Sequence, residues 1–275
     1  MHGMTNMQNS VKSARSKGVL IFATNTKETD YVGIAEQNAR LINHYMGLPT
    51  TIVSAKDTGS NKRFSTDTGT FVEWKNFGRH EAYEASPYDD TIVLDADYLI
   101  FDNSLNRLFD TDFDYLLFNK NRYINIEQQD SVMGPHSLPY VWATAFAFRK
   151  TERARLFFEL VGKIKRNYDY YRLLYNIREG NYRNDYSFAI AKYILSGNIL
   201  RKTDFAPWPI VTVTGNIQSI SKSNTPSGLV VRTPNKGFVL PYQNLHVMSK
   251  SWLTSTALTE LVNQCLDNSL ATAVS

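Results

Sequence analysis

The sequence predicts an α/β fold with a mixed, mainly parallel sheet flanked by helices. Residues 18–25 and 50–54 have the apolar, β-branched composition of strands, and residues 31–46 between them place apolar side chains at helical spacing. A strand, a helix and a second strand in this order form a βαβ unit, which implies parallel pairing. Two further apolar runs, at residues 91–101 and 140–148, read as buried strands of the same sheet.

The remaining segments give less regular patterns. We expect helices over residues 71–86, 153–171, 188–195 and 258–266, and strands on an antiparallel edge over residues 207–213 and 229–240. Polar composition predicts loops over residues 57–67 and 119–139, and residues 105–118 read as a short helical and aromatic connection.

Composition is compatible with one large domain. The chain has 275 residues, 43% of them hydrophobic, and a formal net charge of +4, which permits an anionic ligand or nucleic acid but requires neither. The single Cys265 excludes an intrachain disulfide and is typical of a reducing, cytoplasmic location. No apolar run approaches the length of a membrane span. We expect a flexible arm at 1–17 and one domain at 18–275, with a nucleotide half at about 18–104 and an acceptor half at about 105–255.

Two carboxylates interrupt the apolar run at residues 91–101. Side chains two apart on a strand point to the same side, so Asp95 and Asp97 should face together with only Ala96 between them. Like charges among apolar residues need a compensating cation, and Mg²⁺ or Mn²⁺ binds carboxylate oxygens well. The alternative is that these residues only begin a turn at a strand end.

Ligands of parallel sheets bind beyond the carboxyl ends of the strands, which makes Ala23, Thr24 and Asn25 candidates for ligand contact. Arg79 is a candidate cation for a diphosphate, or else an ordinary surface arginine. Asp185 lies in the first turn of a predicted helix, where it would be either a functional carboxylate or a simple capping residue.

Four places in the chain together resemble the GT-A (Rossmann-like) glycosyltransferases, and most closely glycosyltransferase family eight. They are Ala23-Thr24-Asn25 followed by Tyr31, the Leu94-Asp95-Ala96-Asp97 stretch, Thr144 to Phe148 followed by Asn184-Asp185, and His246 with Lys250 and Trp252. The sequence departs from the family pattern at Ser251, where proline is usual, and at Thr144, where an Asn-Ser/Ala-Gly run is usual.

The resemblance implies transfer of a sugar from a nucleotide-sugar donor, with UDP as the expected nucleotide and retention of anomeric configuration. Asp95, Asp97 and His246 would bind Mn²⁺ or Mg²⁺, and an imidazole ligand suits Mn²⁺ better. Asp185 and Lys250 would act in catalysis. The donor would contact Ala23, Thr24, Asn25, Tyr31, Arg79, Asp95, Ala96 and Lys250.

The acceptor is open at this stage. The chain also resembles small glycosyltransferases of bacteriophages, for which a hydroxymethylated base in DNA is one acceptor, and a protein, lipid-linked or polysaccharide hydroxyl is another. Candidate phosphate contacts, which would otherwise form a solvated surface, are Lys62, Arg63, Lys163, Lys165, Arg166, Arg172 and Arg183. Alternatives to a glycosyltransferase are a non-catalytic nucleotide- or partner-binding GT-A module and a nucleotidyltransferase, although residues 23–30 lack the phosphate loop of the latter. The oligomeric state is not indicated.

Overall fold

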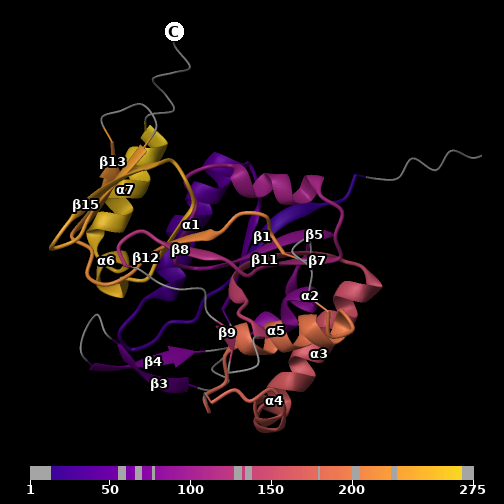
Figure 1. Cartoon of the computed structure of the whole chain (residues 1–275). Coiled ribbons are helices and arrows are strands. Elements are labelled where there is room, and N and C mark those ends of the chain that lie inside the picture. Colours follow the sequence, from indigo (N-terminus) through magenta and orange to yellow (C-terminus); the bar gives the residue numbers. More distant parts are fainter. Residues whose placement is uncertain are drawn as a thin grey trace, which may run out of the picture.

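A five-stranded sheet forms the centre of the structure, which is a computed structural model (Figure 1). The structure describes residues 14–54, 60–65, 70–75, 78–126, 132–133, 138–178, 180–199, 205–223 and 228–267. The strand order is β2 (Thr50–Val53), β1 (Lys17–Phe22), β5 (Asp90–Asp95), β11 (Trp142–Arg149) and β7 (Tyr115–Phe118). β1 pairs in parallel with β2 and β5, whereas β11 is antiparallel to both β5 and β7. Four strands therefore share one direction, which confirms the predicted α/β class with a mainly parallel sheet.

Helices cover both faces of the central sheet. Val19 and Ile21 belong to one apolar cluster, together with α1 (Tyr31–Met46) and α7 (Thr256–Asp267). The intervening Leu20 and Phe22 belong to a second cluster on the opposite face. That face is covered by α2 (Ala82–Ala85), α3 (Glu152–Arg166) and α5 (Asn184–Leu195). Burial on both faces explains why these strands are continuously apolar in sequence.

Capping residues define both ends of the helix in the βαβ unit. The Asp30 carboxylate accepts a hydrogen bond from the Gly33 backbone N–H at 3.0 Å and so caps the N-terminus of α1. Gly47 ends the helix in the left-handed conformation, with φ of 66°. β2 follows three residues later and pairs in parallel with β1, so the predicted strand, helix and strand are present in that order.

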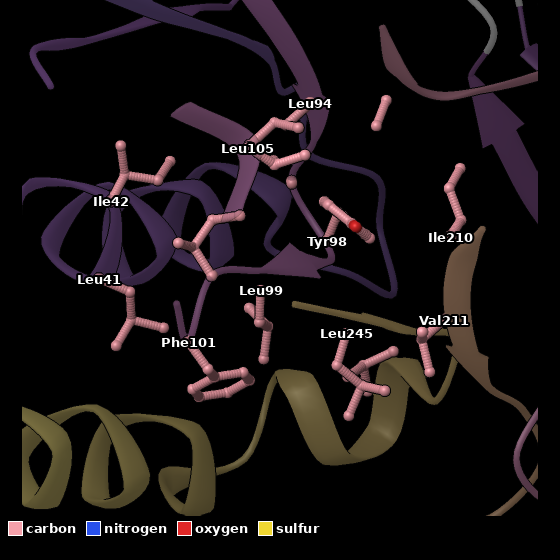
Figure 2. Close-up of a cluster of buried hydrophobic side chains, with 14 of the residues drawn as sticks. Leu41, Ile42, Leu94, Tyr98, Leu99, Phe101, Leu105, Ile210, Val211 and Leu245 are labelled. Carbon is pink, nitrogen blue, oxygen red and sulfur yellow. The ribbon is translucent and has the colours of Figure 1, made fainter. Parts of the chain in front are cut away.

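A second, four-stranded sheet adjoins the central one. Its order is β6 (Tyr98–Leu99), β16 (Leu245–Val247), β12 (Ile210–Val213) and β8 (Asn121–Tyr123). Figure 2 shows Tyr98 and Leu99 between Leu41 and Ile42 on one side and Ile210 on the other, all in one apolar cluster. This packing ties the end of the central sheet to strands far away in sequence.

The C-terminal part adds a three-stranded antiparallel sheet, visible beside α7 in Figure 1. Its strands are β13 (Ser219–Lys222), β14 (Gly228–Arg232) and β15 (Gly237–Pro241). The short helix α6 (Lys250–Leu253) follows β16 and leads into α7. No helix among the described residues combines the length and the hydropathy needed to cross a bilayer.

Several predicted elements were wrong. Part of the expected loop at 57–67 is β3 (Ser60–Ser65), which pairs with β4 (Thr70–Lys75), so the expected helix at 71–86 starts as a strand. Among the described residues of this range, only η1 (Arg79–Glu81) and α2 are helical. The alternation of apolar and polar residues over 72–75 fits a strand, and pairing with β3 selects it.

Further differences lie beyond residue 103. The connection at 105–118 contains η2 (Ser104–Asp110) and then β7, a strand of the central sheet. The expected loop at 119–139 contains β8, and the two-residue strands β9 (Val132–Met133) and β10 (Leu138–Pro139). β12 is parallel to its neighbours rather than part of an antiparallel edge. The expected helix at 153–171 is divided at Asn167 into α3 and α4 (Tyr168–Leu174).

Candidate metal centre

The two aspartates lie where the chain leaves the central sheet. Asp95 is the last residue of β5, Ala96 and Asp97 form a turn, and β6 then enters the second sheet. The prediction of one continuous strand over 91–101 was therefore wrong. The carboxylates come together because the chain turns between them, and not because they alternate along a strand.

The second sheet positions His246 beside this turn. β16 pairs antiparallel with β6 and places His246 opposite Tyr98, and the Val247 backbone N–H donates to the Asp97 carbonyl at 2.9 Å. One ligand atom each from Asp95, Asp97 and His246 lie within 4.8 Å of one another. Residues about 150 positions apart in sequence thus form one group of three metal-binding side chains.

The donor atoms of this group suit a divalent cation. His246 Nε2 lies 3.7 Å from Asp97 Oδ1, while His246 Nδ1 is 3.3 Å from the Thr212 hydroxyl on the neighbouring strand β12. The contact at Nδ1 orients the ring so that Nε2 faces the carboxylates. Two carboxylate oxygens and one imidazole nitrogen form a mixed hard and borderline ligand set that fits a divalent cation.

Two basic side chains neutralise the aspartates. Lys250 forms an ion pair with Asp97, and Arg79 forms one with Asp95. Burial disfavours the charged form of Asp97, but Lys250 and His246 outweigh it and hold the pKa of this carboxyl well below its usual range. Asp97 is therefore ionised at neutral pH, in the state that a metal ligand requires. A cation that binds here would replace part of these ion pairs.

A glycine brings Arg79 to the edge of the sheet. Gly78 has φ of 78°, and a Cβ on it would lie 2.6 Å from the ring of Phe22 at the end of β1. Only glycine lets the chain pass so close to β1 and direct the next residue toward Asp95. Burial lowers the pKa of Arg79, although the nearby Asp185 and Asp97 oppose this shift. Arg79 thus interacts electrostatically with both Asp185 and Asp97.

The residues expected at the nucleotide surround Lys250 and the end of β1. The Lys250 ammonium lies 5.6 Å from the centre of the Tyr31 ring, and burial raises the pKa of Tyr31. Asn25 Oδ1 accepts a hydrogen bond from the Val32 N–H at 2.8 Å. Ala23 and Ala96 are buried, whereas Thr24 is half-buried and Asn25 is exposed. The alanines can therefore offer a ligand little beyond backbone groups.

Asp185 is bound to the start of β11 rather than capping its own helix. Its Oδ1 accepts from the Ala143 N–H at 2.9 Å, and its Oδ2 accepts from Arg183 Nη2 at 2.9 Å and Nε at 3.1 Å. Burial raises the pKa of Tyr140, and the adjacent Asp185 raises it further. The carboxylate is therefore held rigidly, near enough to Arg79 to act on the pKa of its guanidinium.

Tyr140 lies next to Asp185 and contacts other aromatic rings. Tyr140 contacts Trp142 and Tyr186, with ring centres 4.9 and 6.0 Å apart, and Trp142 lies 6.2 Å from Tyr123. Sequence reasoning missed these residues as part of the site, and it placed Arg183 among candidate DNA contacts instead of beside Asp185. Arg183 and Asp185 are two residues apart in sequence, and this spacing was the one feature that could have indicated their ion pair.

The candidate phosphate contacts do not share one environment. Lys163 and Arg166 are exposed on α3, while Lys165 lies 5.7 Å from the Tyr182 ring centre. Arg172 pairs with Asp169. The side chains of Lys62 and Arg63 lie outside the part of the chain whose side chains are described.

Comparison with known proteins identifies no family. No protein-family model and no curated protein matches the chain. Among solved structures, similarity extends to the glycosyltransferase GlyE of Streptococcus pneumoniae, with 12% identity over 70% of this chain and 44% of GlyE and a TM-score of 0.34. The galactosyltransferase LgtC, solved with donor and acceptor sugar analogues, is 14% identical over 63% of this chain and 69% of its own, with a TM-score of 0.37.

A structure with a different activity is similar to the same degree. The inositol-1-phosphate CTP transferase from T. maritima is 8% identical, with 92% of this chain and 97% of that chain covered and a TM-score of 0.39. Since all three TM-scores are below 0.5, these similarities carry no argument about this chain. The case for a function depends on its own residues.

Proposed function

We propose that the protein is a metal-dependent glycosyltransferase of the GT-A type that uses a nucleotide-sugar donor, with UDP as the nucleotide. The observation that carries the proposal is the convergence of Asp95, Asp97 and His246, with ligand atoms within 4.8 Å of one another at the edge of a mainly parallel sheet. Ligands of such sheets bind at this edge. A bound divalent cation would neutralise charge on the donor diphosphate.

The chain's own cations would assist departure of the nucleotide. Lys250 lies beside Asp97 and Arg79 beside Asp95, so both cations would be available to a diphosphate bound at these carboxylates. Fixed positive charges stabilise the negative charge that develops as the glycosidic bond to phosphate breaks. Tyr31, which adjoins Lys250, would border the nucleotide together with Thr24 and Asn25.

Asp185 would border the transferred sugar. Its two oxygens already accept from Ala143 and Arg183, so it would accept hydrogen bonds from sugar hydroxyls in a fixed geometry. Retention of anomeric configuration is part of the proposal and depends on the resemblance to family eight.

The acceptor is proposed only as a hydroxyl group beside Asp185. A hydroxymethylated base in DNA, as expected for a bacteriophage enzyme in its host's cytoplasm, is one acceptor to be tested. A saccharide, protein or lipid-linked hydroxyl is tested beside it. The half-buried rings of Trp142, Tyr123 and Tyr186 could stack on either a sugar or a base.

Thermal unfolding with nucleotides and metals tests the proposal. UDP, GDP and CTP are each added with Mn²⁺ or with EDTA. Ligand at about 100 times its Kd stabilises by roughly 2.7 kcal/mol, which raises the Tm by several degrees for a chain of this size. We expect the shift only when UDP and Mn²⁺ are both present.

Two variants sharpen this test. Asp97→Asn should abolish the shift, whereas Asp110→Asn, an exposed aspartate in η2, should keep it. A shift with CTP and release of pyrophosphate would favour a nucleotidyltransferase. Binding without turnover of any donor would favour a non-catalytic module. Equal unfolding under every condition would reject a nucleotide site at this edge.

A further inference from the structure

The short helix α4 exposes an apolar face. Tyr170, Leu173 and Leu174 retain 64%, 69% and 59% of their accessible surface. Residues spaced by three and four positions lie on the same side of a helix, so these three side chains form one apolar face. Large exposed apolar groups gathered on one helix mark an interaction surface more often than scattered ones do.

The opposite side of α4 is anchored to the protein. Tyr168 is buried and packs edge-on against Tyr182, with ring centres 5.3 Å apart. Tyr171 packs against the second apolar cluster, and Ile177, just after the helix, is buried. Figure 1 shows α4 at the periphery of the molecule, beyond α3. The helix is thus fixed in place with its apolar face directed outward.

Basic residues predominate in the sequence around the exposed face. Residues 163–179 contain five basic side chains and two acidic ones, Glu179 and Asp169, of which Asp169 pairs with Arg172. Lys163 and Arg166 at the end of α3 and Arg178 after α4 are exposed. Arg166 lies four residues before Tyr170 and Arg178 four residues after Leu174, so we expect a surface that contacts α4 to reach these cations.

We propose that α4 and the end of α3 dock onto the surface of an anionic lipid bilayer. Leucine and tyrosine side chains enter the boundary between headgroups and acyl chains, while lysine and arginine remain at the anionic headgroups. A nucleic acid backbone would satisfy the cations but would leave Leu173 and Leu174 without an apolar partner. The combination therefore favours lipid over DNA, and the protein would lie on the membrane without spanning it.

Vesicle sedimentation tests this proposal with the full chain. Vesicles of phosphatidylcholine alone are compared with vesicles containing about 30% phosphatidylglycerol. We expect binding to the anionic vesicles that weakens in 0.5 M salt, and little binding to the neutral ones. Leu173→Ser combined with Leu174→Ser should weaken binding about tenfold or more. Val239→Ser, which changes an equally exposed residue on β15, should leave it unchanged.

A labelling experiment gives a second readout. Cys265 is buried, so an environment-sensitive dye attaches selectively to Leu173→Cys or, as a control, to Val239→Cys. Anionic vesicles should shift the emission of the dye at position 173 to the blue and leave it unchanged at 239. No binding to anionic vesicles, unaltered binding of the leucine double variant, or equal dye response at both positions would overturn the proposal. The proposal would also be overturned if the protein bound duplex DNA through Lys163 and Arg166 and did not bind vesicles.

Discussion

The candidate site has two carboxylate regions, the Asp95 and Asp97 pair and Asp185, and they differ in the groups that bind their oxygens. Asp95 and Asp97 are balanced by the side chains of Arg79 and Lys250, which are charges that a cation can displace. Asp185 is bound by a backbone N–H of β11 and by the two-pronged guanidinium of Arg183. In the proposed function, the first region would exchange its partners for a metal ion and a diphosphate, whereas the second already has its partners and is fixed.

This difference indicates a division of labour. An exchangeable region suits a ligand that must bind and leave in each cycle, such as a metal nucleotide. A fixed carboxylate suits the orientation of a neutral sugar, because a preorganised acceptor needs no rearrangement when the substrate arrives. Arg79 connects the two, since it pairs with Asp95 and also lies in the field of Asp185.

Among the variants, we expect the largest loss of turnover from a change in the Asp95 and Asp97 pair. Asp97→Asn removes a negative ligand, and we expect UDP-sugar turnover in Mn²⁺ to fall by about 1,000-fold or more. Release of UDP from a panel of donors measures this, with Asp110→Asn as the matched control. Turnover within about threefold of wild type would show that Asp97 holds no catalytic metal.

Lys250→Gln should separate metal binding from donor turnover. Loss of a fixed cation near the diphosphate should lower turnover by about 100-fold. Metal affinity without nucleotide should stay equal or increase, because the ammonium no longer competes for Asp97. Titration with Mn²⁺ and steady-state kinetics measure the two properties. A parallel loss of both would mean that Lys250 supports the metal centre structurally.

Asp185→Asn should lower turnover less than the changes above, and it should leave the metal centre unaffected. The amide oxygen can still accept from Ala143, but the charge pairing with Arg183 is lost. We expect turnover to fall by about tenfold to 100-fold while Mn²⁺ affinity is unchanged. Full activity of this variant would remove Asp185 from the proposed catalytic residues.

The smallest expected effect is a loss of stability when the hydrogen bonds of Asn38 to the backbone next to the metal centre are removed. Asn38 of α1 is buried, donates to the Tyr98 carbonyl at 2.8 Å and accepts from the Ile100 N–H at 3.1 Å. Asn38→Ala leaves these groups unpaired, which costs about 1–3 kcal/mol and lowers the Tm by roughly 2–4 °C for each kcal/mol. Thermal unfolding measures it, with the exposed Asn43→Ala on the same helix expected to change little. Equal Tm values for both variants would contradict this role.

The central sheet could be predicted from sequence because its signals are local. The cap at Asp30, the left-handed Gly47 and the apolar runs of β1 and β5 all lie within or next to the elements that they define. The second sheet could not be predicted, since β6 has two residues and β16 has three, too few for any periodicity. Its pairings depend on burial against distant strands.

The candidate site was predictable to a different extent for each member. Asp95 and Asp97 stand out as charges in an apolar run, but the turn that joins them depends on β6 entering another sheet. His246 was indicated only by the family resemblance, because nothing in its own neighbourhood points to residue 97. One partner of Asp185 is the backbone of Ala143, and a backbone N–H cannot be recognised in the sequence.

Manganese binding is the most direct test of the central claim, that Asp95, Asp97 and His246 form a metal centre. Electron paramagnetic resonance of free Mn²⁺ is followed during titration of the wild-type protein, Asp97→Asn, His246→Ala and the control Asp110→Asn, with and without UDP. We predict one site in the wild type and the control, tighter with UDP, and loss of the site in both ligand variants. Equal Mn²⁺ binding by all four proteins, or by none, would contradict the claim.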